Sequence, residues 1–286
     1  MAAEITICKT LNPREYLTQI DMKEADTNFV SALSKSDENI HSVLYQESTV
    51  GLALAKRGRH AFLYIYIFPA HRCRGFGKAA ALLLEHELYT CNPANISTCY
   101  RTDNFIADTF ARDCGYIKEY SCDYMIYSGP CFEPMTVPVR QYKDKDYSEA
   151  HSMYAEAFHL MRLGTGCFPN SVPEPSSEEG RKYWSDTENE RLVFLNGEDI
   201  VGYAHIKGSE IGSVSVKPDC QGKGVGKAFV KYIVNMLLYT GYESISLYCV
   251  VGNNRARHLY DELGFSQVYC NNYAKKKILF KTNGKI

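Results

Sequence analysis

Apolar and polar positions along the chain predict two similar series of strands and helices. The first half is expected to form strands at 5–8, 41–47, 50–56, 61–68, 96–100 and 116–127, and helical segments at 14–34, 79–88 and 104–113. The second half is expected to form strands at 137–142, 192–195, 200–206, 211–216 and 244–251. Its helices are predicted at 147–163, around Trp184, at 227–238 and after 253.

The two series share an internal repeat. Pro69 and Pro218 are 149 positions apart, and the same spacing holds without a gap as far as Gly115 and Gly264. The further pairs at this spacing are Arg72 with Gln221, Gly75 with Gly224, Gly77 with Gly226, Lys78 with Lys227, Asn104 with Asn253, and Ala107 with Ala256. The chain therefore looks like two copies of one domain.

A linker is predicted between the copies. The segment 128–138 contains three prolines and a glycine, which is typical of a connection between domains. We therefore expect an N-terminal domain at 1–130 and a C-terminal domain at 131–286. The length of 286 residues also favours two domains over one.

A glycine-rich loop follows the strand 211–216. Three alternating glycines, at 222, 224 and 226, lead into a helix, so several backbone N–H groups and the positive end of the helix dipole converge on one point. A phosphate or pyrophosphate is the ligand such a loop favours. The nucleotide-triphosphate loop differs, because it needs four residues before its Gly-Lys pair and then Ser or Thr, whereas here three residues separate Gly222 from Gly226-Lys227 and Ala228 follows. The dinucleotide fingerprint G-x-G-x-x-G differs as well.

The loop resembles the Q/R-x-x-G-x-G motif of the GNAT superfamily of N-acetyltransferases, and Arg72 to Gly77 repeats it in the first copy. The segment Asn253 to Phe265 is similar to the family's second signature, N-x-x-A-x-x-L-Y-x-x-x-G-F. The resemblance implies an α/β (α+β) fold of two tandem GNAT domains, each a mixed, mostly antiparallel twisted sheet flanked by helices. The tandem form resembles that of the mycothiol synthase family, although that substrate is not implied.

The resemblance also implies a site for acetyl-CoA as co-substrate. The loop would hold its pyrophosphate, through Gln221, Gly222, Lys223, Gly224, Val225, Gly226 and Lys227. The backbone of Val214, Ser215 and Val216 would pair with the pantetheine arm and polarise the thioester. Asn253 would contact the same arm.

The resemblance also implies that Tyr260 lies near the thioester sulfur and would serve as general acid for the departing thiolate. Tyr260 shares a helix face with Ala256 and Leu259, so an alternative is that it only packs in the core with its hydroxyl paired. The residue 149 positions earlier is Ala111, which cannot donate a proton. We therefore expect the second domain to be catalytic, and the first to be structural, regulatory or a degenerate binder.

The predicted reaction is direct transfer of acetyl to a primary amine of a small molecule. Alkylamines have pKa values near ~10, so a base must remove a proton from the attacking group. Carboxylates near the start of the strand that precedes the glycine loop are the usual base in the family that the chain resembles, and Glu210 is the nearest match. An equally supported interpretation is that Glu210 is only an exposed residue of a turn. A non-catalytic acyl-CoA-binding sensor or regulatory module is the alternative function.

Two further features of the second copy bear on its substrate. About 17 residues within 164–180 have no counterpart in the first copy, and a loop of this kind is either idle surface or shapes the acceptor pocket. His205 is at the end of a predicted strand. We interpret it as a buried, hydrogen-bonded residue in preference to a residue that contacts the substrate.

The composition of the chain limits the classes of molecule that it is expected to bind. The formal net charge is −1, so neither nucleic acid nor a membrane surface is an expected partner. No run of apolar residues approaches the ~20 needed to cross a bilayer, and a cytoplasmic location is expected. The 11 cysteines include no C-x-x-C pair, so no metal site is expected. A homodimer and the identity of the acceptor amine remain open.

Overall fold

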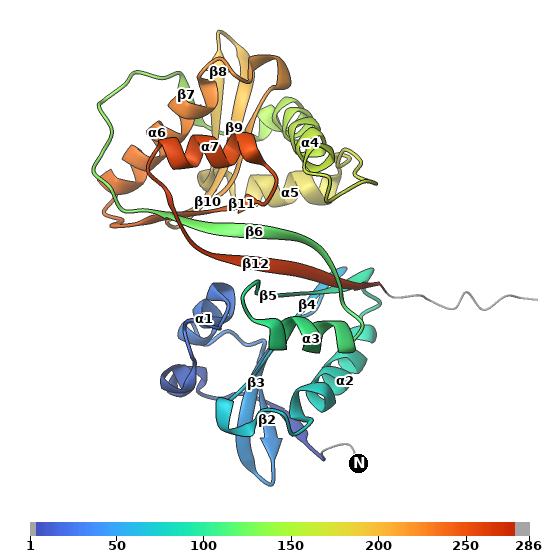
Figure 1. Ribbon diagram of the computed structural model, residues 1–286. Coiled ribbons are helices and arrows are strands. Elements are labelled where there is room, and N and C mark those ends of the chain that lie inside the picture. Colours follow the sequence, from blue (N-terminus) through green and yellow to red (C-terminus); the bar gives the residue numbers. More distant parts are fainter. Residues whose placement is uncertain (1–3, 278–286) are drawn as a thin grey trace, which may run out of the picture. The chain divides into compact units, whose positions relative to one another are not determined.

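The computed structural model describes residues 4–277, which divide into two compact units (Figure 1). Of the described residues, unit 1 contains 4–121 and 271–277, and unit 2 contains 122–270. This division differs from the boundary at 130/131 that the linker predicted. The difference arises because each repeat contributes its last strand to the other unit.

Unit 1 has a sheet with the strand order β1-β2-β3-β4-β5-β12. Neighbouring strands are antiparallel except β4 and β5, which are parallel. Its strands are β1 (Thr6–Lys9), β2 (Ile40–Tyr45), β3 (Ser48–Lys56), β4 (His60–Ile67), β5 (Asn95–Arg101), the start of β6 (Ile117–Tyr127) and the end of β12 (Ser266–Lys277). Its helices are η1 (Pro13–Gln19), α1 (Thr27–Ser34), η2 (Pro69–His71), α2 (Phe76–Tyr89) and α3 (Phe105–Asp113).

The helical region predicted at 14–34 is divided into η1 and α1. Asp26 starts α1, because its carboxylate accepts hydrogen bonds from the N–H groups of Asn28 at 2.9 Å and Phe29 at 3.3 Å. A side chain that caps a helix in this way fixes its first turn, so α1 begins at Thr27 and does not continue from η1.

Unit 2 has a sheet with the strand order β6-β11-β10-β9-β8-β7, in which β10 and β11 are parallel and the other neighbours antiparallel. Besides its parts of β6 and β12, its strands are β7 (Val139–Gln141), β8 (Arg191–Asn196), β9 (Asp199–Lys207), β10 (Glu210–Val216) and β11 (Ile245–Val250). Its helices are η3 (Asp144–Asp146), α4 (Tyr147–Gly164), α5 (Glu178–Asp186), η4 (Glu188–Glu190), η5 (Pro218–Cys220), α6 (Val225–Tyr239) and α7 (Asn254–Glu262).

The exchange of last strands is reciprocal. In unit 1, β5 pairs with residues 271–277 of β12, which belong to the second repeat. In unit 2, β11 pairs with residues 122–127 of β6, which belong to the first repeat. Each sheet is therefore completed by a strand from the other half of the sequence.

Two apolar clusters hold the layers of unit 2 together. On one face of the sheet, α6 and α7 pack against β9, β10 and β11 around Phe229, Ile233 and Leu247. On the other face, α4 and α5 pack around Trp184 and Tyr203, whose rings stack at 4.4 Å. Strand β9 contributes to both clusters, as expected for a strand covered by helices on both faces.

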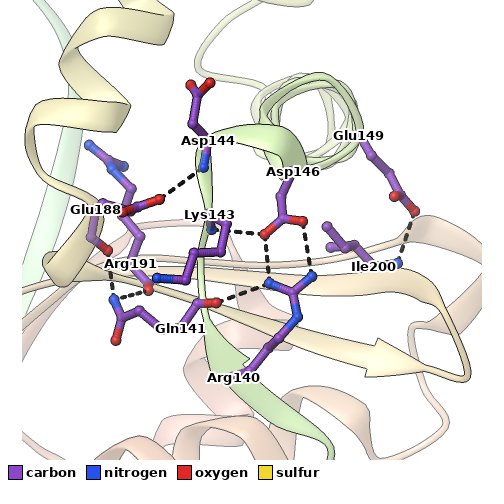
Figure 2. Close-up of polar contacts among 9 residues, drawn as sticks. All are labelled: Arg140, Gln141, Lys143, Asp144, Asp146, Glu149, Glu188, Arg191 and Ile200. Atoms are coloured by element: carbon purple, nitrogen blue, oxygen red, sulfur yellow. Dashed lines mark hydrogen bonds and ion pairs between the residues drawn. The ribbon is translucent and has the colours of Figure 1, made fainter.

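Polar contacts fix the start of α4 on the sheet (Figure 2). The Arg140 guanidinium donates two hydrogen bonds to the Asp146 carboxylate, at 2.6 and 2.9 Å. The N–H of Ile200 donates to Glu149 at 2.9 Å, and this bond connects α4 to β9. These contacts hold α4, which forms one wall of the cleft described below.

The linker segment docks on α6. The side-chain amide of Asn235 exchanges two hydrogen bonds with the backbone of Phe132, at 2.7 and 3.0 Å. Lys231 lies over the Phe132 ring at 5.1 Å. The segment 128–138 thus has no regular secondary structure and is nevertheless fixed to unit 2.

Candidate active site

Strands β10 and β11 part soon after they begin. Their parallel pairing covers Glu210 with Ser246 and Ile211 with Leu247. Beyond it, a β-bulge interrupts the pairing of β10 with β9 between Ile211 and Ser213. A bulge bends its strand and increases the local twist, so it directs β10 away from β11 and leaves a gap in the sheet.

The glycine loop lies at the far end of this gap. Gly222 and Gly224 have φ values of 76° and 86°, in the left-handed region that glycine enters without strain. Gly224 is the N-cap of α6 and makes no side-chain cap, so the first N–H groups of the helix have no intrahelical partner. The Gln221 side chain donates to the Val216 carbonyl at 2.9 Å and ties the loop to β10.

A cleft of about 640 Å³ runs between the loop and the splayed strands. Its volume is in the range of sites that enclose small organic ligands. The lining residues that the sequence had singled out are Val214, Ser215, Val216, Gln221, Gly222, Gly224, Gly226, Lys227, Asn253 and Tyr260. The structure therefore brings most of the predicted coenzyme site together.

Tyr260 faces the cleft from α7. It is 8% exposed and packs with Cys249 and Phe265, with its ring 5.7 Å from that of Phe265. Cys249 is two residues beyond Leu247, and Ser213 is two residues beyond Ile211, so both lie equally far from the point where the strands part. Tyr260 therefore lies beside β11, near a residue two positions beyond the point where the strands part.

The environment of Tyr260 keeps its hydroxyl protonated. Burial raises the pKa of Tyr260 well above its ordinary value of 10.0, and the nearby Cys249 adds to the effect. Within residues 4–277, no hydrogen bond is assigned to this hydroxyl. Tyr260 thus packs in the core of unit 2 and also lines the cleft.

Cys249 also lines the cleft and is an unreactive thiol. Burial raises the pKa of Cys249 to about 11. Because the thiolate is the nucleophilic form of cysteine, this side chain is a poor nucleophile at neutral pH.

Three predicted residues do not line the cleft: Glu210, Lys223 and Val225. Glu210 is the first residue of β10, on the paired side of the bulge, and is half-buried. Lys223 is exposed on the loop, whereas Val225 packs against the core of unit 2.

Asn253 and Lys227 line the cleft, and the side chain of each forms a polar contact within the protein. The Asn253 side chain accepts a hydrogen bond from the N–H of Ala256 at 3.3 Å and caps α7. Lys227 forms an ion pair with Glu262 at 2.5 Å. The Lys227 charge is thus partly neutralised by its neighbour.

Arg255, in the first turn of α7, lines the cleft beside the loop and was not predicted from the sequence. Its guanidinium donates to the Gln221 side chain at 2.6 Å. It also lies 3.2 Å from the position that a Cβ atom on Gly222 would take. Because its partner is a neutral amide, Arg255 keeps a full positive charge at the loop. The sequence signal that could have identified Arg255 is a cationic residue directly after Asn253 and Asn254.

The corresponding loop of unit 1 has the same backbone but a different setting. Cys73 and Gly75 have φ values of 58° and 83°, and Arg72 donates to the Ile67 carbonyl at 2.9 Å, as Gln221 does to Val216. The Arg72 guanidinium is bound to Glu24 at 2.7 Å. Its charge is therefore already compensated.

The cleft of unit 1 is almost closed. A cavity of about 60 Å³ lies at the equivalent place, lined by Ile65, Asn104 and Ala111 among others. The β3–β4 pairing runs without a bulge from Gly51 with Ile67 to Lys56 with Phe62. A space of this size has room for little more than water molecules.

The end of the cleft beyond the bulge is walled by α4. Ala157, Phe158, Leu160 and Met161 line it with apolar surface. The segment 165–177 that follows α4 has no regular helix or strand, as the sequence predicted, and α5 then begins at Glu178 with Ser177 as its N-cap.

Among residues 4–277, no helix is long and apolar enough to cross a membrane.

Comparisons with known proteins agree with this geometry. Residues 157–265 match the acetyltransferase (GNAT) family. A 59-residue stretch is 39% identical to mycothiol acetyltransferase of Propionibacterium freudenreichii subsp. shermanii, and it covers 21% of this chain and 19% of that protein. The match thus spans about a fifth of that relative's length.

Solved structures resemble nearly the whole chain. A GCN5-related N-acetyltransferase from Sphaerobacter thermophilus has a TM-score of 0.70 at 16% identity, over 96% of this chain and 95% of that one. A tandem GNAT protein from the clavulanic acid biosynthesis pathway has a TM-score of 0.60 at 11% identity, over 96% and 98%. The chain therefore has the tandem GNAT fold, and the part that carries the cleft matches the GNAT acetyltransferase family.

Proposed function

We propose that unit 2 is an acetyl-CoA-dependent N-acetyltransferase that acts on a primary amine of a small molecule by direct attack. The observation that carries this proposal is the position of Tyr260. The protonated phenol of Tyr260 lines the cleft beside β11, and the glycine loop, which would bind the pyrophosphate, lines the same cleft.

The dimensions of the cleft suit the coenzyme. The N–H groups of the loop and the Arg255 guanidinium would bind the pyrophosphate. The exposed edge of β10 from Val214 to Val216 would bind the pantetheine arm. Gly212 and Val216 are four residues apart, or roughly 13 Å at ~3.3 Å per residue, so the thioester would lie near the bulge.

In the proposed reaction, the neutral amine attacks the thioester carbonyl carbon. The N–C bond forms, the C–S bond breaks, the nitrogen gives up one proton to a base, and the thiolate takes a proton from the Tyr260 hydroxyl. Backbone N–H groups of β10 at the bulge would stabilise the negative charge on the carbonyl oxygen. The protonated thiol of Cys249 disfavours an acyl-cysteine intermediate and supports direct transfer.

The apolar wall of α4 supports an acceptor with an apolar portion next to its amine, because Phe158 and Met161 offer no charge to it. For unit 1 we propose no acetyl transfer. Ala111 replaces the acid, and the equivalent cavity is about 60 Å³.

The test measures CoA formed from acetyl-CoA, by reverse-phase chromatography, with a panel of primary amines that includes arylalkylamines, polyamines and amino sugars. Binding of acetyl-CoA is measured in parallel by calorimetry. Turnover with at least one amine supports the proposal. Binding without turnover across the panel would instead favour an acyl-CoA-binding module, and absence of binding would exclude both functions.

A further inference from the structure

The proposed reaction needs a group that removes the proton from the amine, and the cleft offers few. Glu210 does not line it and is the first residue of β10, where that strand is still paired with β11, before the bulge. Glu262 lines the cleft, but its carboxylate forms an ion pair with the Lys227 ammonium group at 2.5 Å. His258 is exposed next to Glu262, near the loop and away from the bulge.

His205 lies directly behind the bulge. It is opposite Ser213 in the pairing of β9 with β10, and Ser213 lines the cleft. His205 itself does not line the cleft, but its Nδ1 atom is 3.3 Å from the point where a Cβ atom on Gly212 would be, so only the missing side chain of Gly212 leaves space between that nitrogen and the cleft. Gly212 also lines the cleft.

The other ring nitrogen is bound to a carboxylate. Nε2 lies 3.1 Å from Glu190 Oε2, at the end of η4. In the neutral imidazole, Nε2–H then donates to Glu190, and the lone pair of Nδ1 faces the bulge. A carboxylate that fixes the tautomer of a histidine in this way is typical of histidines that accept protons.

The first repeat lacks every part of this arrangement. Leu54 is opposite Tyr64 in unit 1, where unit 2 has His205 opposite Ser213. Leu63 stands where the repeat places Gly212, and its strand has no bulge. The histidine, the glycine and the bulge thus occur together, in the unit that has the open cleft and Tyr260.

We propose that His205 is the proton acceptor of the acetyl transfer, with Glu190 as its positioning residue. The inference rests on the proposed function of unit 2. As the amine attacks, its N–H bond breaks and the proton passes to Nδ1 of His205, directly or through one water molecule. Tyr260 gives its proton to the thiolate. Exchange with solvent then returns His205 to its neutral form and reprotonates Tyr260.

Charges around His205 favour the neutral ring. Burial lowers the pKa of His205 below 6.5, and the positive charges of Arg191 and Lys207 lower it further, whereas Glu190 raises it. Arg191 is opposite His205 on β8, and Gly212 and Ser213, which face the ring from β10, are uncharged. The base form is thus present at neutral pH, and kcat/KM should fall as the pH decreases through this lowered pKa.

The test is the pH dependence of kcat/KM with the best amine of the panel. In His205→Gln, we expect a loss of about 10²-fold at pH 7, within the range for removal of a general base. The loss should shrink toward pH 10, where the amine is increasingly neutral by itself. Acetyl-CoA affinity should be unchanged, and His41→Gln, which alters a half-buried, hydrogen-bonded histidine of unit 1, should keep the wild-type profile.

Two neighbouring substitutions give opposite shifts. Glu190→Gln removes the charge that raises the pKa of His205, so the acid limb should move to lower pH. Arg191→Met removes a charge that lowers it, so the limb should move to higher pH. These two variants also carry the test if His205→Gln does not fold, as judged by circular dichroism.

A wild-type pH profile in a folded His205→Gln, or limbs that shift in the same direction in the two neighbouring variants, would overturn the inference and leave the proposed function intact. Absence of turnover by the wild-type protein across the amine panel would overturn both.

Discussion

The Phe110 ring lies 3.2 Å from the position that a Cβ atom on Gly77 would take, at the start of α2 in unit 1. In unit 2 the equivalent pair is Leu259 and Gly226, at 3.7 Å, and a cleft of about 640 Å³ is open beside it. The Phe110 ring also lines the cavity of unit 1, which is only about 60 Å³.

We therefore expect one molecule of CoA to bind per chain. Gly224→Asp should abolish binding, because aspartate is tolerated at a helix N-cap and in the left-handed region, and its charge repels the pyrophosphate. Gly224→Asn has the same shape without the charge and should retain most of the affinity. Gly75→Asp, at the equivalent N-cap in unit 1, should leave stoichiometry and affinity unchanged. A stoichiometry of two by calorimetry would contradict this prediction.

Arg255 should contribute to coenzyme affinity through its charge. Arg255→Gln is expected to weaken CoA binding about tenfold, which corresponds to ~1.4 kcal/mol. The dependence of the affinity on salt concentration should also decrease, because one charge fewer faces the phosphates. Arg257→Gln is the control, since Arg257 is on the same helix, pairs with Asp123 at 2.7 Å and does not line the cleft. Equal losses of affinity in the two variants would argue against a specific role.

Tyr260→Phe should lower kcat about 10²-fold while the CoA dissociation constant stays the same, because the phenol acts only when the thiolate leaves. The raised pKa of Tyr260 means that its hydroxyl stays protonated below pH 10, so the wild-type rate should not fall on the alkaline side up to that pH. Tyr232→Phe, a half-buried tyrosine of α6 outside the cleft, is the control. An alkaline decline below pH 9 in the wild type, or full activity in Tyr260→Phe, would remove Tyr260 from this role.

The exchanged strands predict which fragments fold. Residues 131–286 alone lack the strand 122–127 that pairs with β11, so this fragment should aggregate or associate through the exposed edge. Residues 122–270 contain every strand of unit 2 and should be monomeric and bind CoA. Size-exclusion chromatography and calorimetry on both fragments provide the measurement. A monomeric 131–286 fragment that binds CoA would show that residues 122–127 are dispensable.

The sequence was a good guide to local structure and to the loop, since both depend on short-range patterns. The elements around the glycine loop and the place of Tyr260 in the cleft follow from residues close together in the chain. The helix predicted at 227–238 is α6, although it begins two residues earlier.

Other features could not be read from local patterns. Glu210 was chosen for its position near the motif strand, but the bulge two residues later separates it from the cleft. His205 and Glu190 are 15 residues apart and meet only because β8 and β9 pair. The strand exchange was unpredictable because 122–127 and 271–277 are similar strands at equivalent repeat positions, so either could complete either sheet.

The exchange means that a mutation and its effect can lie in different repeats. Residues 122–127 belong to the first repeat, which has Ala111. A substitution there nevertheless alters the strand beside β11, and β11 forms one wall of the open cleft. Residues 271–277 belong to the second repeat, which has Tyr260, and a substitution there alters the sheet of unit 1. The two repeats can therefore differ at positions such as 111 and 260, but neither sheet is complete without a strand from the other repeat.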